Sequence, residues 1–422
     1  MAGNSITEKY EYKTLILTSY DGHEQRIKNR QYPRHFVTYD YPAMDCLEAQ
    51  WLRGLGRSVQ NRTFYIPMWH NPIYLRETFT GGTEFDIESA CMYGMYNVKY
   101  VEVFFDDDVG QTQNIAREVD YLSEHIIGVK KAIVATLKSP RAWVFPLRRC
   151  SVQPMQGLQY VYSDGSNVSY SFEDMLDTVE NPSIPDSVRD NYEEFTGWNL
   201  WGLPEVYTNR YVFLHTPQWV NDDSVSLSMT KNTNLLDNSW GIEKYDMKNL
   251  MSYDVHTLNL YLTCREEINN LVRFFKRVQG MYKAFWMPTW VNDISCPFDI
   301  NAGDTEIITD FTKLHNYSKT NGRTRKLVVF TKDWTYYIFQ VLTYGTLMRN
   351  GVEYGRILLT SPVATTIPKE NILMISYLSL VRLDSDELQL NYETDWSANV
   401  QISFREVDDE FTPNVIYDYI EE

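Results

Sequence analysis

An internal duplication is the feature that most constrains this chain, because a repeated module decides how the residues of both copies are read. Residues 45–56 and residues 263–280 each place a capping residue three positions before a glutamate, then apolar residues at helical spacing, then a glycine. This pattern predicts one short, capped, amphipathic helix in each half. The residues that define it are Asp45, Leu47, Glu48 and Trp51 in the first copy and Thr263, Glu266 and Phe275 in the second.

Two further elements repeat in the same order after each helix. The first is the pattern F-x-x-P-x-W-x-N, and the second is an alternating segment that begins with Asn-Val and ends in Ser-Phe, as a half-buried strand does. Three matching elements in one order indicate duplication. Their defining residues are Pro67, Trp69, Asn71, Asn167 and Phe172 in the first copy and Pro288, Trp290, Asn292, Asn399 and Phe404 in the second.

The repeats predict two modules, at residues 1–178 and 206–410, joined by a linker at 179–205 that contains turn formers without periodicity. Short strand-like segments dominate both modules. We therefore expect a mainly β chain with short helices, built as two duplicated β-sandwich or barrel-like modules with one amphipathic helix each. The acidic residues 411–422 contain aromatic and aliphatic side chains, so this arm is either a solvated tail or docks on a neighbouring subunit.

Period-two patterns place the strands. Residues 119–137 stay ambiguous, because part of the segment has nearly helical spacing and its end is strand-like. The expected strands are residues 13–20, 35–41, 98–105, 210–216, 224–229, 326–331, 336–342 and 372–382.

Composition excludes several classes of protein. The chain has 39 basic and 56 acidic residues, a net charge of −17, so a DNA-binding surface or a membrane anchor is not expected. No window approaches the roughly 18 consecutive apolar residues of a membrane span, and the N-terminus has no signal-peptide core. The five cysteines form no CxxC pair, so buried thiols in a reducing compartment are expected.

No catalytic motif is present, and we expect no enzyme, no cofactor and no metal. The seven histidines lack the i, i+4 spacing of a helical metal site, and the sequence has neither a nucleophile elbow nor a phosphate loop. Asp106, Asp107 and Asp108 could offer oxygen ligands to a hard cation, but adjacent strand residues diverge, which favours an exposed turn. Paired acids with aromatic rings would also suit a glycoside hydrolase, although sequence cannot place two acids at the required separation.

Trp69 and Trp290 occupy equivalent positions in the two copies, which favours a packing role over the stacking of carbohydrate. Basic residues mix with aromatic ones at 141–149 and cluster at 319–326. Nucleic-acid binding is one interpretation, and salt bridges between subunits are the one we prefer for a chain of this charge.

Five features occur together in this chain: Glu24-Gln-Arg26, Arg30-Gln-Tyr-Pro-Arg34, the capped helix, the Pro-x-Trp strand and the ending Phe404-Arg-Glu-Val407. In this combination the chain resembles the distal tail and baseplate proteins of long-tailed bacteriophages and the tail-tip proteins of gene transfer agents. In the first module, the segment Phe172-Glu-Asp-Met175 fits the strand ending of this family less well. Such proteins commonly carry one module of this kind, whereas this chain has two.

The resemblance implies a structural virion protein, assembled in the host cytoplasm, that forms a ring at the distal end of the tail tube. Its expected partners are further copies of itself, the tail tube protein, and the hub and tail fibre proteins, and DNA would pass through without specific binding. Three chains would present six modules and six chains twelve, and either ring can close through heterologous contacts. A carbohydrate-binding adhesion module and a tail-associated glycan hydrolase are the alternatives.

Overall fold

The computed structural model describes residues 6–19, 24–59, 62–88, 98–106, 112–123, 125–137, 142–153, 157–162, 165–175, 206–207, 210–217, 225–230, 233–236, 239, 244–247, 253–318 and 325–407. The expected linker, most of the basic cluster at 319–326 and the acidic arm lie outside these residues. Within them the chain is mainly β, with antiparallel strands and short helices.

The strands and the helix of the first half are β1 (Ile6–Glu11), β2 (Thr14–Thr18), β3 (Glu24–Lys28), β4 (Arg34–Asp45), α1 (Cys46–Val59), β5 (Thr63–Pro67), β6 (Ile73–Tyr74), β7 (Gly82–Asp86), β8 (Tyr100–Asp106), β9 (Thr112–Leu122), β10 (Ile126–Ile133), β11 (Ala142–Val152), β12 (Gly157–Tyr162) and β13 (Gly165–Asp174).

Those of the second half are β14 (Val206–Tyr207), β15 (Arg210–Tyr211), β16 (Ser226–Thr230), β17 (Thr233–Leu236), β18 (Lys244–Met247), β19 (Tyr253–Leu262), α3 (Arg265–Val278), β20 (Phe285–Pro288), β21 (Glu306–Thr309), α4 (Leu314–Ser318), β22 (Lys326–Thr331), β23 (Tyr336–Arg349), β24 (Val352–Leu359), η4 (Lys369–Asn371), β25 (Ile372–Leu383), β26 (Glu387–Tyr392) and β27 (Ala398–Glu406).

The two halves pair their strands in the same order. β4 pairs with β13 as β19 pairs with β27, and β5 pairs with β11 as β20 pairs with β25. The pairs β11–β13, β12–β13 and β1–β4 correspond to β25–β27, β26–β27 and β16–β19. Hairpin β2–β3 corresponds to hairpin β17–β18, and each long strand leads into a 14-residue helix. The chain therefore contains two copies of one topology, called here the first and the second module.

The correspondence extends to the register of single residues. Pro67 lies opposite Leu147, and Pro288 lies opposite Leu378. Further along the same strands, Phe172 pairs with Val152 and Phe404 pairs with Leu383. Since 231 positions separate the two leucines (378 − 147) and also Val152 from Leu383 (383 − 152), the strand registers agree without a slip.

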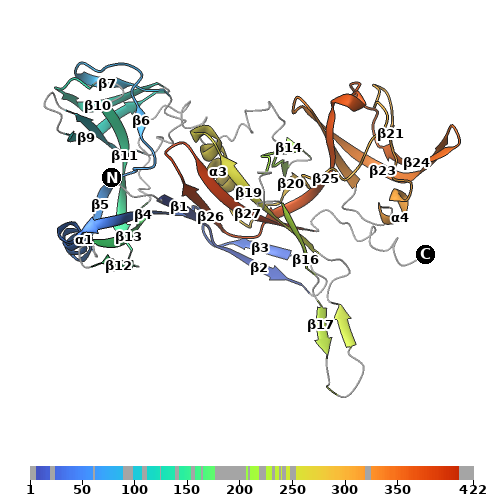
Figure 1. Cartoon of the computed structure of the whole chain (residues 1–422), viewed down its shortest axis with the longest axis horizontal. Helices are drawn as coiled ribbons and strands as arrows, with labels where there is room; N and C mark the ends of the chain where they lie inside the picture. Colours follow the sequence, from blue (N-terminus) through green and yellow to red (C-terminus); the bar gives the residue numbers. More distant parts are fainter. Residues whose placement is uncertain are drawn as a thin grey trace.

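Each module carries a lobe inserted at the same point of the topology. The first lobe consists of β6–β10 and the second of β21–β24 with α4, and they lie at opposite ends of the molecule (Figure 1). Each has its own apolar core, separate from the core of the module that carries it. Of the segment 119–137, ambiguous in sequence, residues 119–122 end β9 and residues 126–133 form β10 of the first lobe, and their buried apolar side chains belong to its core.

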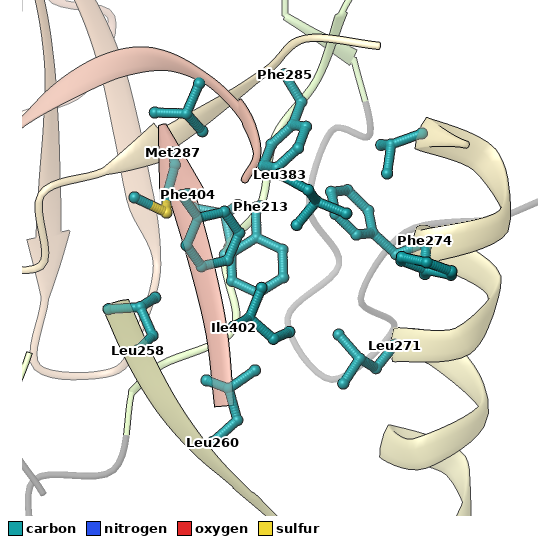
Figure 2. Packing of buried hydrophobic residues seen from close by; sticks show 14 of the residues in the cluster. Phe213, Leu258, Leu260, Leu271, Phe274, Phe285, Met287, Leu383, Ile402 and Phe404 are labelled. Carbon is teal, nitrogen blue, oxygen red and sulfur yellow. The ribbon is translucent and has the colours of Figure 1, made fainter. Parts of the chain in front are cut away.

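The core of the second module lies between α3 and the strands that face it. Phe274 on the helix meets Phe285 at 4.9 Å and Phe213 at 5.1 Å between ring centroids, and Phe404 lies 5.1 Å from Phe213 (Figure 2). Phe213 comes from residues 210–216, for which a strand was predicted. That prediction is wrong beyond β15 and a single bridge from Val212 to Trp286 of β20; the apolar side chains that follow are buried in this core.

Candidate functional site at the junction of the two modules

Strand β1 belongs to both modules at once. It pairs on one side with β4 of its own module and on the other with β26 of the second module, over the same six residues, Ile6 to Glu11. Figure 1 shows β1 and β26 side by side at the centre of the molecule. One antiparallel sheet therefore continues from the first module into the second. We call the contact of β1, β2 and β3 with β25, β26 and α3 the junction.

A buried polar network lies on this shared strand and centres on Glu8. Its Oε1 lies 2.7 Å from His35 Nε2 and 3.6 Å from His70 Nε2, and its Oε2 accepts a 2.6 Å hydrogen bond from the Tyr392 hydroxyl. His35 Nδ1 lies 3.1 Å from Asp174 Oδ2. Four of these residues come from the first module and Tyr392 from the second, so the network joins the modules.

Burial and the neighbouring side chains together set the pKa values of Glu8, His35 and His70. Burial disfavours the ionised form of Glu8, but the nearby charges and hydrogen bonds of His70 and His35 outweigh it and hold the pKa of that carboxyl well below its usual value. Burial also opposes protonation of His35, yet hydrogen bonds to Asp174 and Glu8 raise its pKa. At His70 burial prevails and lowers the pKa. The geometry thus favours an ionised Glu8 against a protonated His35.

A second polar contact of the junction comes from hairpin β2–β3. Arg382 on β25 is buried and donates from Nε and Nη2 to the two carboxylate oxygens of Glu24, at 2.8 Å and 2.9 Å. Arg26 donates to the carbonyl of Tyr282, 3.1 Å away. A fork-to-fork pair of this kind fixes orientation as well as adding energy. Both Glu24 and Arg26 belong to the E-x-R segment of the resemblance.

The turn before β26 holds the third contact. The Asp386 carboxylate accepts hydrogen bonds from the Thr14 hydroxyl and the Met281 amide, both at 2.9 Å. It lies against Gly280, whose φ of +64° suits glycine and whose missing side chain leaves room: a Cβ there would lie 2.4 Å from Asp386 Oδ1. The hydroxyl of Tyr74, on β6, donates to the carboxylate of Asp395, between β26 and β27, at 2.6 Å.

The predicted helix caps are only partly present. α3 starts after Cys264, and Glu267, not Glu266, accepts hydrogen bonds from the amide and hydroxyl of Thr263, at 2.7 Å and 3.0 Å. The capping pair predicted from Thr263 and Glu266 is therefore wrong by one residue. α1 starts directly after Asp45, the last residue of β4, and Glu48 lies in its first turn.

The strand and helix registers explain the shift. β4 and β19 correspond with an offset of 219 positions (256 − 37), and the helices start at Cys46 and Arg265 with the same offset (265 − 46), so Glu48 corresponds to Glu267. The apolar pattern expected to bury α1 is also incomplete, because Leu47 is 75% exposed and Trp51 67% exposed. Phe275 of α3 is buried, with its ring 5.5 Å from that of Tyr12.

The repeated tryptophans both pack against aromatic side chains, Trp290 fully buried and Trp69 partly buried. Trp69 lies with its ring centroid 5.1 Å from Phe104 and 5.0 Å from Phe145, and Trp290 stacks on Phe330 at 5.3 Å. The remaining predicted residues also serve the strands. Pro67 and Pro288 end β5 and β20. The backbone amide of Asn71 donates to the carbonyl of Met68, the side chain of Asn292 accepts from the Ile375 amide, and Asn167 and Asn399 lie opposite Gln159 and Asn391 in their sheets. Phe172 packs edge-on against Phe64, and Phe404 is fully buried.

One group in the described part of the chain has donor atoms close enough together for a cation. Asp254, His256 and Glu406 present ligand atoms within 4.8 Å of one another on β19 and β27. Two carboxylates and an imidazole could serve as ligands for a divalent ion. Of the aspartates weighed in the sequence, Asp106 ends β8 and accepts a hydrogen bond from Thr112, and the next two lie outside the described residues.

The central residues of the junction were not found by sequence reasoning. Glu8 and Tyr392 are 384 positions apart, and neither lies in a repeated motif. His35 and His70 were considered only for metal-ligand spacing. The signal that could have found the histidines is their position, since His35 is the second residue of β4 and His70 follows β5 by three residues, and both strands belong to the repeat.

Comparisons with known proteins assign no family. No family model and no curated protein matches the sequence. Among solved structures, an oxalate decarboxylase of Bacillus subtilis is 10% identical, with 96% of this chain and 78% of that chain covered and a TM-score of 0.10. One of Lactobacillus farciminis is 8% identical, with coverages of 98% and 93% and a TM-score of 0.09. These scores are too low to support an argument. No helix in the described residues is long and apolar enough to cross a bilayer.

Proposed function

We propose that this chain is a structural protein of a phage tail tip. It forms a ring around the DNA channel at the distal end of the tail tube, as a trimer or a hexamer, and holds the hub, fibres or receptor-binding proteins. Its place is the virion, after assembly in the host cytoplasm. It acts as a scaffold, without catalysis or cofactor.

The observation that supports this most is the continuous sheet of the junction. Two equivalent modules meet through different surfaces, β1 with its hairpin on one and β26 with α3 on the other. Contacts between unlike surfaces are heterologous, and their repetition around an axis produces a ring when the rotation closes. A chain that already contains one such contact is suited to ring assembly.

The residues behind the resemblance add support, because several of them lie in the junction. Glu24 and Arg26 hold the second module, and Arg30 donates to the carbonyl of Glu11 at the end of β1, 2.7 Å away. The net charge of −17 suits a channel that must let DNA pass without holding it.

The test is electron microscopy of the purified full chain in negative stain. The proposal predicts particles with threefold or sixfold symmetry and a central hole. A stable monomer at high protein concentration would contradict it.

One observation favours carbohydrate binding as a second candidate function. Trp51 presents an exposed indole on α1, a suitable surface for stacking a sugar ring. A glycan array should then show binding that is lost in Trp51→Ala and kept in Trp396→Ala. An array without signal would dismiss this candidate.

A further inference from the structure

The outer edge of the second module matches the strand that the first module uses at the junction. β16 occupies in the second module the place of β1 in the first, and among the described residues it pairs with β19 alone. β12 likewise occupies the place of β26 and pairs with β13 alone in the same residues. The two edges that meet at the junction, those of β26 and β1, therefore recur at β12 and β16, where the described residues include no such partner strand.

The registers identify which residues of β16 correspond to those of β1. Glu8 lies opposite Val37, and Leu227 lies opposite His256, 219 positions after Val37, the offset of the two long strands. Leu227 therefore corresponds to Glu8. By the same count Met229 corresponds to Tyr10.

A third position follows from the tryptophan motif. His70 comes directly after Trp69, and Val291 comes directly after Trp290. The strand context agrees, since the amide before Trp69 binds the carbonyl of Pro146 and the amide before Trp290 binds that of Tyr377, both at 3.0 Å and 231 positions apart (377 − 146).

The corresponding positions differ sharply in exposure. In the first module Glu8 is 5% and His70 4% exposed, because the second module covers them, with Tyr392 in contact with both. In the second module Leu227 is 54%, Met229 72% and Val291 51% exposed. Three apolar side chains thus lie in solvent at positions where, in the first module, Glu8 and His70 are buried and Tyr10 is partly buried. An exposed strand edge flanked by apolar residues is a template for strand addition.

We infer that β16 of one chain pairs with β12 of a second copy, in the register of the junction, and that Leu227, Met229 and Val291 are buried by that copy. The inference deepens the proposed ring by naming the surface that joins its subunits. In the register of β1 and β26, where Glu8 lies opposite Leu390, the backbone of Leu227 lies opposite that of Leu158 in the neighbour.

Leu158-Gln-Tyr160 and Leu390-Asn-Tyr392 support this match. The two segments correspond because Gln159 lies opposite Asn167 as Asn391 lies opposite Asn399. The strand that the second copy would add therefore has nearly the sequence of the strand already added within the chain.

The first test compares two double variants of the full chain by analytical ultracentrifugation. Leu227→Glu with Met229→Glu places charges on the proposed surface, and Leu342→Glu with Met348→Glu changes similarly exposed apolar residues on β23 of the second lobe. The first should weaken self-association at least about 100-fold, while the control should assemble like the unchanged chain. Circular dichroism and melting establish that both variants fold.

The outcomes separate this inference from the proposed function. If the unchanged chain forms rings and the β16 variant forms them equally well, the surface is wrong and the ring proposal stands. If the unchanged chain is monomeric at high concentration, both fall.

A second test probes the register directly. Leu227→Cys combined with Leu158→Cys should give disulfide-linked dimers and larger ladders on a non-reducing gel, above the level of either single variant. A ring whose ladder is no stronger than that of the single variants would overturn the proposed pairing.

Discussion

Replacing Glu8 with glutamine should loosen the two modules from each other. Glu8 accepts from Tyr392 at 2.6 Å, from Tyr10 at 2.8 Å and from His35 at 2.7 Å, and it is almost fully buried. Glutamine has nearly the same shape but no charge and one acceptor oxygen in place of two. In its protonated form His35 then keeps Asp174 as its hydrogen-bonded counter-ion and loses the charge of Glu8.

Removing one partner of a buried, hydrogen-bonded ion pair costs about 3 to 5 kcal/mol, and we expect a loss in that range for Glu8→Gln. The matched control is Glu387→Gln on the neighbouring strand. Glu387 forms a 3.0 Å ion pair with Lys9, and the two side chains are 52% and 30% exposed, so loss of this pair should cost less than about 1 kcal/mol. Urea unfolding followed by tryptophan fluorescence measures both. Equal midpoints for the two variants would refute the argument that the buried network holds the junction.

Three further predictions follow from the same structure. The pKa of His35 is higher in the folded protein than in the unfolded chain, so its contribution is complete below about pH 6.5 and is lost as the pH rises through the folded pKa; the stability difference between the unchanged chain and His35→Gln in urea should shrink with rising pH, and a constant difference would contradict this. Gly280→Ala should lose well over about 1 kcal/mol in thermal melting because it adds a clash with Asp386 to backbone strain, whereas Gly303→Ala, at φ +91° with open space around it, reports the strain alone; equal losses would exclude the clash. Phe285→Ala should cost about 3 to 5 kcal/mol by leaving a cavity among the rings under α3, and an unchanged melting temperature would show that this core is not packed as described.

Local patterns in the sequence were enough to predict much of the architecture. The mainly β composition, the helices and the order of repeated elements depend on periodicity and on residues such as Pro67 and Pro288, whose effects act within a few positions. The predicted segment 326–331 is β22 to the residue. Helix starts were less certain, since Thr263 can cap with a glutamate three or four positions later, and only the geometry selects Glu267.

The junction could not be predicted in the same way. The partner of β1 on its second side is β26, and no local pattern indicates which distant edge a strand will meet. The pairing of Glu24 with Arg382 spans 358 positions and depends on that edge. Burial of Trp51 was predicted from helical spacing alone, which shows that a face is apolar but not what covers it.

The difference between the inner and outer edges has a physical reason. β1 and β26 belong to the same chain, so their contact forms at high effective concentration. Such a contact tolerates a buried ionic network, in which the cost of desolvating the charges offsets much of the attraction between them. A contact between separate chains must also offset the lost translational and rotational freedom of association. Leucine and methionine at the positions of Glu8 and Tyr10 avoid that desolvation and gain from burial. An edge specialised for assembly between copies is therefore expected to be apolar where the internal edge is ionic, as β16 is.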